Sequence, residues 1–99
     1  MGKLVRNKIP EIIRADGKEP ITRVLSEYEF LNELDKKLNE EVEEYQADKS
    51  LEELADVMEV VYTICEARGF AIEDLLKIKA QKKDKRGGFE DRIYWEGNK

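Results

Sequence analysis

The fold is decided by residues 26–68, which read SEYEFLNELDKKLNEEVEEYQADKSLEELADVMEVVYTICEAR. Apolar residues recur here at spacings of three and four, which is the period of an amphipathic helix. Ser26 and Ser50 are each followed three residues later by glutamate, the pattern of a capped helix start. We therefore predict one helix from Ser26 to about Ala47 and another from Ser50 to about Arg68. Because the connection has only about four residues, the two helices should be antiparallel neighbours.

The segments on either side of residues 26–68 add two more predicted helices, so the predicted fold class is all-α. A short helix is expected at Ile9–Arg14, where a proline in the first turn is tolerated, and a last helix from Ile72 to about Arg86. Residues 19–25 are predicted to be extended, with a short strand as one possible form, and residues 89–95 to form an irregular or extended tail.

The helix predicted after Ser50 is apolar around more than one face, so part of its surface should contact a second copy. The expected fold is a small antiparallel helix bundle completed by oligomerisation, with short extended N- and C-terminal segments. Residues 1–99 are expected to form a single domain, since 99 residues fit one domain.

Composition narrows the chemistry. There is no histidine and one cysteine, Cys65, which excludes an intrachain disulfide and a Cys/His zinc site. Any acid–base catalysis near neutral pH would then depend on carboxylates, lysine, tyrosine or a water molecule activated by a metal. No apolar run approaches the roughly 18 residues that span a bilayer, and Met1–Arg6 is too poor in apolar residues for a signal peptide. We expect a cytoplasmic protein without membrane contact.

Charge is segregated along the chain. Residues 1–14 carry four basic and one acidic side chain, residues 40–59 one basic and nine acidic, and residues 77–86 six basic and one acidic. Such runs are most simply solvated helix faces, but an acidic centre between basic ends also suits a site for a metal and a polyphosphate. Nucleic-acid binding is not expected, because the acidic segment would repel the phosphate backbone.

One glutamate occupies a position where leucine would be expected. On a helical wheel Glu41 falls within the apolar arc of Leu34 and Leu38, and Glu44 lies on the flank of that arc. An unpaired buried carboxylate costs several kcal/mol or becomes protonated. The acidic segment contains only one lysine, Lys49, so a divalent cation is the simpler compensation.

The following helix supplies a matching pair, Glu53 and Asp56, three residues apart beside apolar neighbours. Together with Glu41 and Glu44 they would form an oxygen-only site, which suits magnesium or manganese. The alternative is surface decoration, because acidic pairs at this spacing are common on exposed helices.

The acidic pattern matches a known family. Residues 40–44 (EEVEE) followed by residues 53–56 (ELAD) resemble the EExxE…ExxD signature of the MazG-like, all-α nucleoside triphosphate pyrophosphohydrolases. That superfamily includes phosphoribosyl-ATP pyrophosphatase and the dimeric dUTPases. Residues 3–13 (KLVRNKIPEII) and 86–89 (RGGF) look like the opening and the end of small single-domain members. The resemblance therefore extends over nearly the whole chain.

The resemblance implies a reaction and a set of roles. A nucleoside triphosphate would be hydrolysed between its α and β phosphates to a monophosphate and pyrophosphate, by a homodimer or homotetramer that cleans the nucleotide pool. Glu41, Glu44, Glu53 and Asp56 would be the metal ligands. Glu40 would act with Glu41 in catalysis, as an accessory acid that orients or deprotonates the attacking water.

The basic ends are candidates to hold the outer phosphates. Arg6 and Arg86 are favoured because they lie within the family-like motifs, and the aromatic Phe89 and Trp95 can either stack on a base or pack the tail. The full set of phosphate candidates is Lys3, Arg6, Lys8, Lys79, Lys82, Lys83 and Arg86.

Two alternatives stay open. Within the enzyme class, the substrate could be phosphoribosyl-ATP. Outside it, the chain could be a non-catalytic helical dimer module that binds nucleotide or a protein partner without turnover. The gap from Glu44 to Glu53 is short for the superfamily, so the two central helices must turn tightly.

Overall fold

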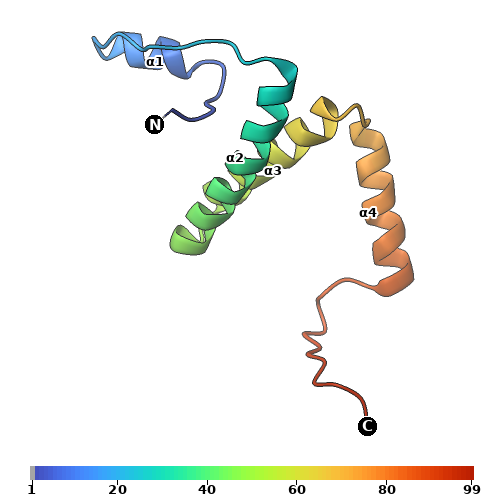
Figure 1. Ribbon diagram of the computed structural model, residues 1–99. Coiled ribbons are helices and arrows are strands. Elements are labelled where there is room, and N and C mark those ends of the chain that lie inside the picture. Colours follow the sequence, from blue (N-terminus) through green and yellow to red (C-terminus); the bar gives the residue numbers. More distant parts are fainter. Residues whose placement is uncertain (1) are drawn as a thin grey trace.

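The computed structural model describes residues 2–99, and Met1 lies outside the described residues. These residues form four helices and no strand, so the all-α prediction is confirmed. The helices are α1 (Ile9–Ala15), α2 (Glu27–Asp48), α3 (Leu51–Ala67) and α4 (Ile72–Arg86) (Figure 1).

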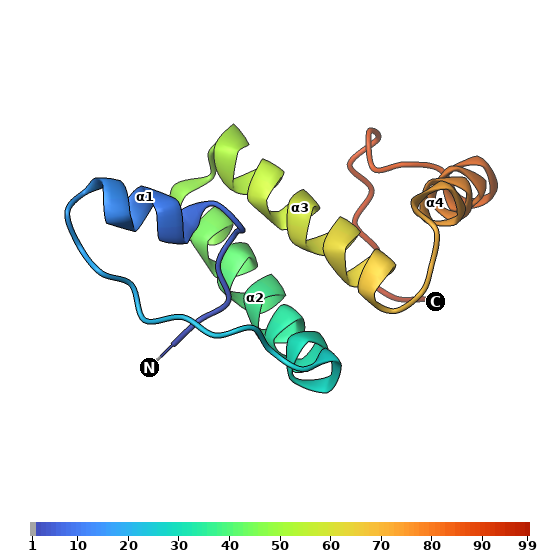
Figure 2. The ribbon, with the colours of Figure 1, turned by 90° about the horizontal axis from the view of Figure 1, so that it is seen from above.

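The segment predicted to be extended at residues 19–25 does not form the short strand that was considered for it. This segment runs as coil between α1 and α2 (Figure 2). A strand needs a neighbouring strand to pair its backbone N–H and C=O groups, and the described residues offer none. The tail after α4 is irregular, as predicted.

The two central helices form the expected antiparallel hairpin (Figures 1 and 2). At the start of α2, Ser26 Oγ accepts a hydrogen bond from the Glu29 N–H at 3.2 Å, and the Glu29 carboxylate accepts one from the Ser26 N–H at 3.2 Å. At the start of α3, Ser50 Oγ accepts from the Glu53 N–H at 3.2 Å. Lys49 adopts a left-handed conformation (φ 59°) that ends α2. The starts of α2 and α3 and the end of α2 thus each have a local cause.

The apolar core lies between α2 and α3 and is small. Among the described residues, the buried apolar ones are Leu34, Val60 and Cys65, and Glu41 is the one buried charged residue. The radius of gyration is 17.8 Å, against about 13 Å for a compact domain of 100 residues. α4 contacts α3 near their connection and then diverges from the hairpin (Figure 1). One chain therefore does not enclose a full core by itself.

None of the helices in residues 2–99 combines the length and the apolar character that a membrane span requires.

Candidate metal centre

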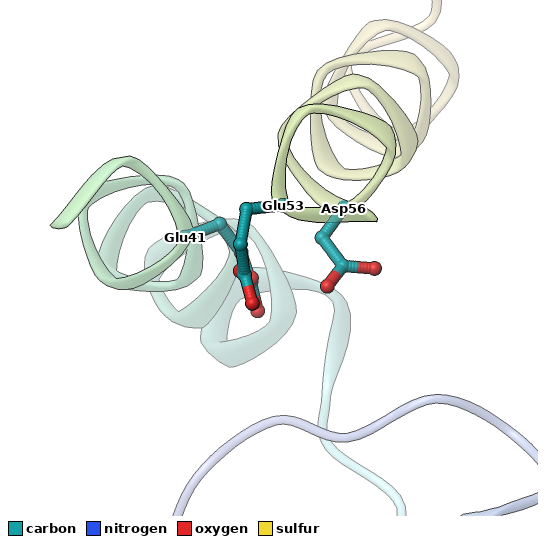
Figure 3. Close-up of side chains that lie close together, drawn as sticks. All are labelled: Glu41, Glu53 and Asp56. Carbon is teal, nitrogen blue, oxygen red and sulfur yellow. The ribbon is translucent and has the colours of Figure 1, made fainter. Parts of the chain in front are cut away.

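Three carboxylates converge where α2 and α3 face each other. Glu41 comes from the core-facing side of α2, seven residues after Leu34, while Glu53 and Asp56 come from the first two turns of α3. One carboxylate oxygen from each of the three lies within 4.8 Å of the others. Figure 3 shows Glu41 and Glu53 side by side, with Asp56 pointing into the same space. The hairpin therefore brings together three of the four predicted metal ligands.

Two oxygens of this cluster are buried without a partner. Glu41 is only 7% exposed, and neither Glu41 Oε2 nor Glu53 Oε2 receives a hydrogen bond. A buried acceptor left unpaired costs roughly 1–3 kcal/mol, and more when it is charged. A proton or a bound cation would satisfy these two atoms.

The carboxylates also perturb one another. Burial, followed by the neighbouring Glu44 carboxyl, raises the pKa of Glu41 above its ordinary value. Burial, followed by the charges of Asp56 and Glu41, raises the pKa of Glu53. Without a cation this cluster therefore tends to take up protons, whereas a bound cation would favour its ionised form.

A lysine that was not predicted as a partner lies next to Glu41. Lys37 Nζ lies 2.7 Å from Glu40 Oε2 and 3.4 Å from Glu41 Oε1. Lys49, the only lysine of the acidic segment, instead donates to Gln46 Oε1 at 2.6 Å. The sequence carries a signal for this pair, because Lys37 precedes Glu40 and Glu41 by about one helical turn.

Lys37 compensates only part of the negative charge of the carboxylates. Pairing with Glu40 and Glu41 raises the pKa of Lys37, although burial acts to lower it. The hydrogen bond from Lys37 lowers the pKa of Glu40, which is held ionised. Glu41 Oε2 still has no partner. The lysine thus compensates part of the buried negative charge, and the rest is left without a protein partner.

The N-terminal segment reaches the cluster from the other end of the sequence. Arg6 Nη2 donates to Asp56 Oδ1 at 2.7 Å, and Lys3 Nζ lies 3.7 Å from Glu40 Oε1. Both residues were predicted as phosphate ligands, and both lie at the carboxylates. Their pairing with particular acids was not predicted, since 50 residues separate Arg6 from Asp56.

The other predicted residues lie further out. Glu44 is exposed and outside the three-carboxylate group, although it influences the pKa of Glu41. Lys8 is exposed at the start of α1. Four of the six basic residues of α4 line a pocket with residues 87–90 and form no ion pair with Glu41, Glu53 or Asp56; they are Lys79, Lys82, Lys83 and Arg86.

Comparison with known proteins adds one relative. An uncharacterized protein of Mycolicibacterium smegmatis (strain ATCC 700084 / mc(2)155) is 53% identical over 47 residues, which are 48% of this chain and 48% of that protein. The match thus spans about half the length of that relative. No family model matches the chain, and no solved structure matches it. These comparisons assign no function, so the functional argument rests on the geometry of the carboxylates.

Proposed function

We propose that this chain is a magnesium-dependent nucleotide pyrophosphohydrolase of the MazG-like kind. It cleaves a nucleoside triphosphate between the α and β phosphates, releases a monophosphate and pyrophosphate, and serves to clean the nucleotide pool. The observation that carries the proposal is the convergence of the Glu41, Glu53 and Asp56 carboxylates, with two buried oxygens that have no partner.

The donor set fits a hard divalent cation. All candidate ligand atoms are carboxylate oxygens, and the chain has no histidine to favour zinc. Magnesium binds oxygen at about 2.0–2.1 Å in an octahedron, so neighbouring ligand oxygens lie about 2.9 Å apart. The three carboxylate oxygens, which lie within 4.8 Å of one another, would have to move closer together to bind one ion. Glu44, one turn after Glu41, would supply a fourth carboxylate. Manganese has the same preference for oxygen ligands and can replace magnesium.

The bound cation would neutralise phosphate oxygens and make a water molecule more acidic. The remaining tasks belong to the side chains of the chain. Glu40, held ionised by Lys37, accepts a hydrogen bond from the attacking water and orients it. Arg6 and Lys3 lie beside the same carboxylates and can turn toward the outer phosphates. Phosphoryl chemistry needs this charge neutralisation and positioning more than it needs a covalent nucleophile.

The proposed protein is a homodimer or homotetramer in the cytoplasm. The support is the small core: most large apolar side chains of α3, α4 and the tail remain partly or fully exposed in one chain. A soluble chain rarely leaves so much apolar surface in water.

The experiment is hydrolysis of a panel of canonical, deoxy and damaged triphosphates, together with phosphoribosyl-ATP, with magnesium and with chelator. Pyrophosphate and monophosphate are measured, to distinguish α–β cleavage from release of inorganic phosphate. Turnover of phosphoribosyl-ATP alone would name that compound as the substrate.

The matched variants are Glu53→Gln, inside the cluster, and Glu43→Gln, on an exposed side chain outside it. Glu53→Gln should remove activity and Glu43→Gln should keep it. If no triphosphate gives pyrophosphate at high protein concentration, the hydrolase proposal is wrong. Magnesium-dependent binding of triphosphate without turnover would identify a nucleotide-binding module.

A further inference from the structure

A cavity of about 910 Å³ opens between the N-terminal segment (residues 2–7), the coil before α2 (residues 21–25) and the first half of α2. Figure 2 shows this coil leaving α1 and returning to the start of α2. The volume lies in the range of roughly 300–1,000 Å³ that is usual for small-molecule sites. None of the three clustered carboxylates lines the cavity. We call it the N-terminal cavity, and it is separate from the metal centre.

Two residues connect the N-terminal cavity to the carboxylates. Lys3 and Arg6 both line the cavity. Lys3 Nζ also lies 3.7 Å from Glu40 Oε1, and Arg6 Nη2 lies 2.7 Å from Asp56 Oδ1. The two residues proposed to turn toward the outer phosphates therefore stand between the cavity and the acids. A nucleotide whose phosphates lie at these residues has its nucleoside next to the cavity.

The face of α2 that lines the cavity leads directly to Glu40. Asn32 and Lys36 are lining residues, and at 100° per residue they fall with Glu40 within an arc of roughly 80°. Along the helix axis Lys36 lies about 6 Å before Glu40, and Asn32 about 12 Å before it. The cavity and the proposed water-orienting carboxylate thus share one side of α2, within about two turns.

Apolar side chains form two walls of the cavity. Leu4 and Val5 come from the N-terminal segment, and Ile21, Val24 and Leu25 come from the coil. Ile21 and Val24 are essentially fully exposed, so no protein group covers them in the described chain. A nucleobase has two flat faces of low polarity, which such side chains can contact from either side. Because no aromatic side chain lines the cavity, stacking contributes little to the choice of base.

The charged side chains of the α2 wall are paired with neighbours. Arg23 Nη2 lies 2.9 Å from Glu29 Oε2, and Lys36 Nζ lies 2.9 Å from Glu33 Oε2. These pairs leave the deeper part of the cavity without a strong excess of charge of either sign. It therefore suits the uncharged part of a nucleotide better than it suits the phosphates.

The uncharged polar side chains of the lining are those of Asn7, Thr22 and Asn32. An asparagine amide offers two donors and an acceptor, which can match the edge of a base. Asn32 lies on α2, whereas Asn7 and Thr22 lie outside the helices. Because side chains on helices are held more precisely than those on loops, Asn32 is the best placed of the three to read a base.

We propose that the N-terminal cavity binds the nucleoside of the triphosphate and that Asn32 distinguishes one base from another. The base packs between the apolar side chains of residues 4–5 and 21–25, and its edge forms hydrogen bonds with the Asn32 amide. The phosphates pass Lys3 and Arg6 to reach the carboxylates. The identity of the ligand as a triphosphate rests on the proposed function.

The location is tested by photo-cross-linking of the full chain with 8-azidoadenosine triphosphate and with 4-thiouridine triphosphate, in the presence of magnesium. Mass spectrometry of the peptides should find the base attached within residues 2–7, 21–25 or 32–36, and an excess of unmodified triphosphate should remove the label. Labels confined to α3 or α4, or no label that the unmodified compound removes, would overturn the proposal.

The role of Asn32 is tested by base selectivity. Asn32→Asp replaces an amide by an ionised carboxylate, which only accepts hydrogen bonds, and guanine presents two adjacent donors where adenine presents one. The ratio of kcat/KM for guanosine triphosphate to that for adenosine triphosphate should rise at least about tenfold. Asn39→Asp, the same change at an exposed position of α2 outside the cavity, should keep the wild-type ratio. A wild-type ratio in Asn32→Asp would remove Asn32 from the site.

The outcomes separate the two proposals. An active wild type that is labelled only outside the cavity would overturn the nucleoside site and leave the hydrolase intact. A wild type that releases no pyrophosphate but is labelled in the cavity would overturn the hydrolase and retain the nucleoside site. In that case calorimetry would measure the same base ratio in dissociation constants.

Discussion

The α2–α3 hairpin and the C-terminal arm, by which we mean residues 72–95 with α4 and the tail, are both rich in charged residues. They differ in how far these charged side chains are exposed to solvent. The hairpin places one acid in its core and two more beside it, where burial raises the pKa of Glu41 and Glu53. The arm exposes all of its charged side chains. The hairpin helices also begin with side-chain caps, whereas α4 has no side-chain cap. The difference indicates that the hairpin is the better stabilised part of the described chain.

The largest expected effect comes from the hairpin core. Leu34→Ala should lower the free energy of unfolding by about 2–5 kcal/mol, because Leu34 is 2% exposed and its removal leaves a cavity. The matched change in the arm is Leu76→Ala, which should cost under about 1 kcal/mol at low protein concentration. Denaturant titration at two protein concentrations measures both. If Leu34→Ala and Leu76→Ala lowered the free energy of unfolding equally at low protein concentration, the contrast between the hairpin and the arm would be contradicted.

Magnesium should stabilise the hairpin and leave the local stability of the arm unchanged. At a hundred times its dissociation constant, a ligand specific to the folded state adds about 2.7 kcal/mol. The wild type and the exposed control Glu43→Gln should show that gain as a higher Tm. Glu41→Gln should lose it, and without magnesium should be no less stable than the wild type, since it removes a buried charge. A magnesium shift of the same size in Glu41→Gln would rule out Glu41 as a ligand.

Replacement of Arg6 should weaken triphosphate binding much more than it lowers the free energy of unfolding. The Arg6–Asp56 pair is short but largely exposed, so Arg6→Ala should cost under about 1 kcal/mol of stability. Loss of a charge-assisted bond to phosphate, worth about 1.5–3 kcal/mol, should weaken triphosphate binding at least tenfold. Calorimetry with a non-hydrolysable triphosphate measures the binding, and Arg14→Ala, on the exposed side of α1, is the control. Unchanged affinity in Arg6→Ala would remove Arg6 from the phosphate site.

The smallest effect concerns the cap of α2. Hydrogen bonds from Arg23 and Ser26 lower the pKa of Glu29 from 4.5 to about 2. Because the pKa is lower in the folded state, this stabilisation is fully present above about pH 4.5 and is lost as the pH falls through about 2. In Glu29→Gln the free energy of unfolding should depend less on pH over that range. Glu27→Gln, an exposed glutamate in the same turn, is the control, and equal pH profiles for the two variants would contradict the assignment.

The boundaries of the helices and the inward position of Glu41 were predictable from sequence, because they depend on neighbours within one or two turns. Serine caps, apolar spacing and a short connection all act locally. Lys37 also belongs to this class and could have been found by the same spacing rule.

Other features were decided only by the tertiary structure. The pairing of Arg6 with Asp56, the exclusion of Glu44 from the inner group and the divergence of α4 each depend on how helices pack against one another. The sequence by itself thus determined an all-α chain with an acidic hairpin, because periodicity and capping are local properties. Which acids meet, and which basic residues reach them, required the tertiary structure, because contacts across 50 residues follow from packing geometry.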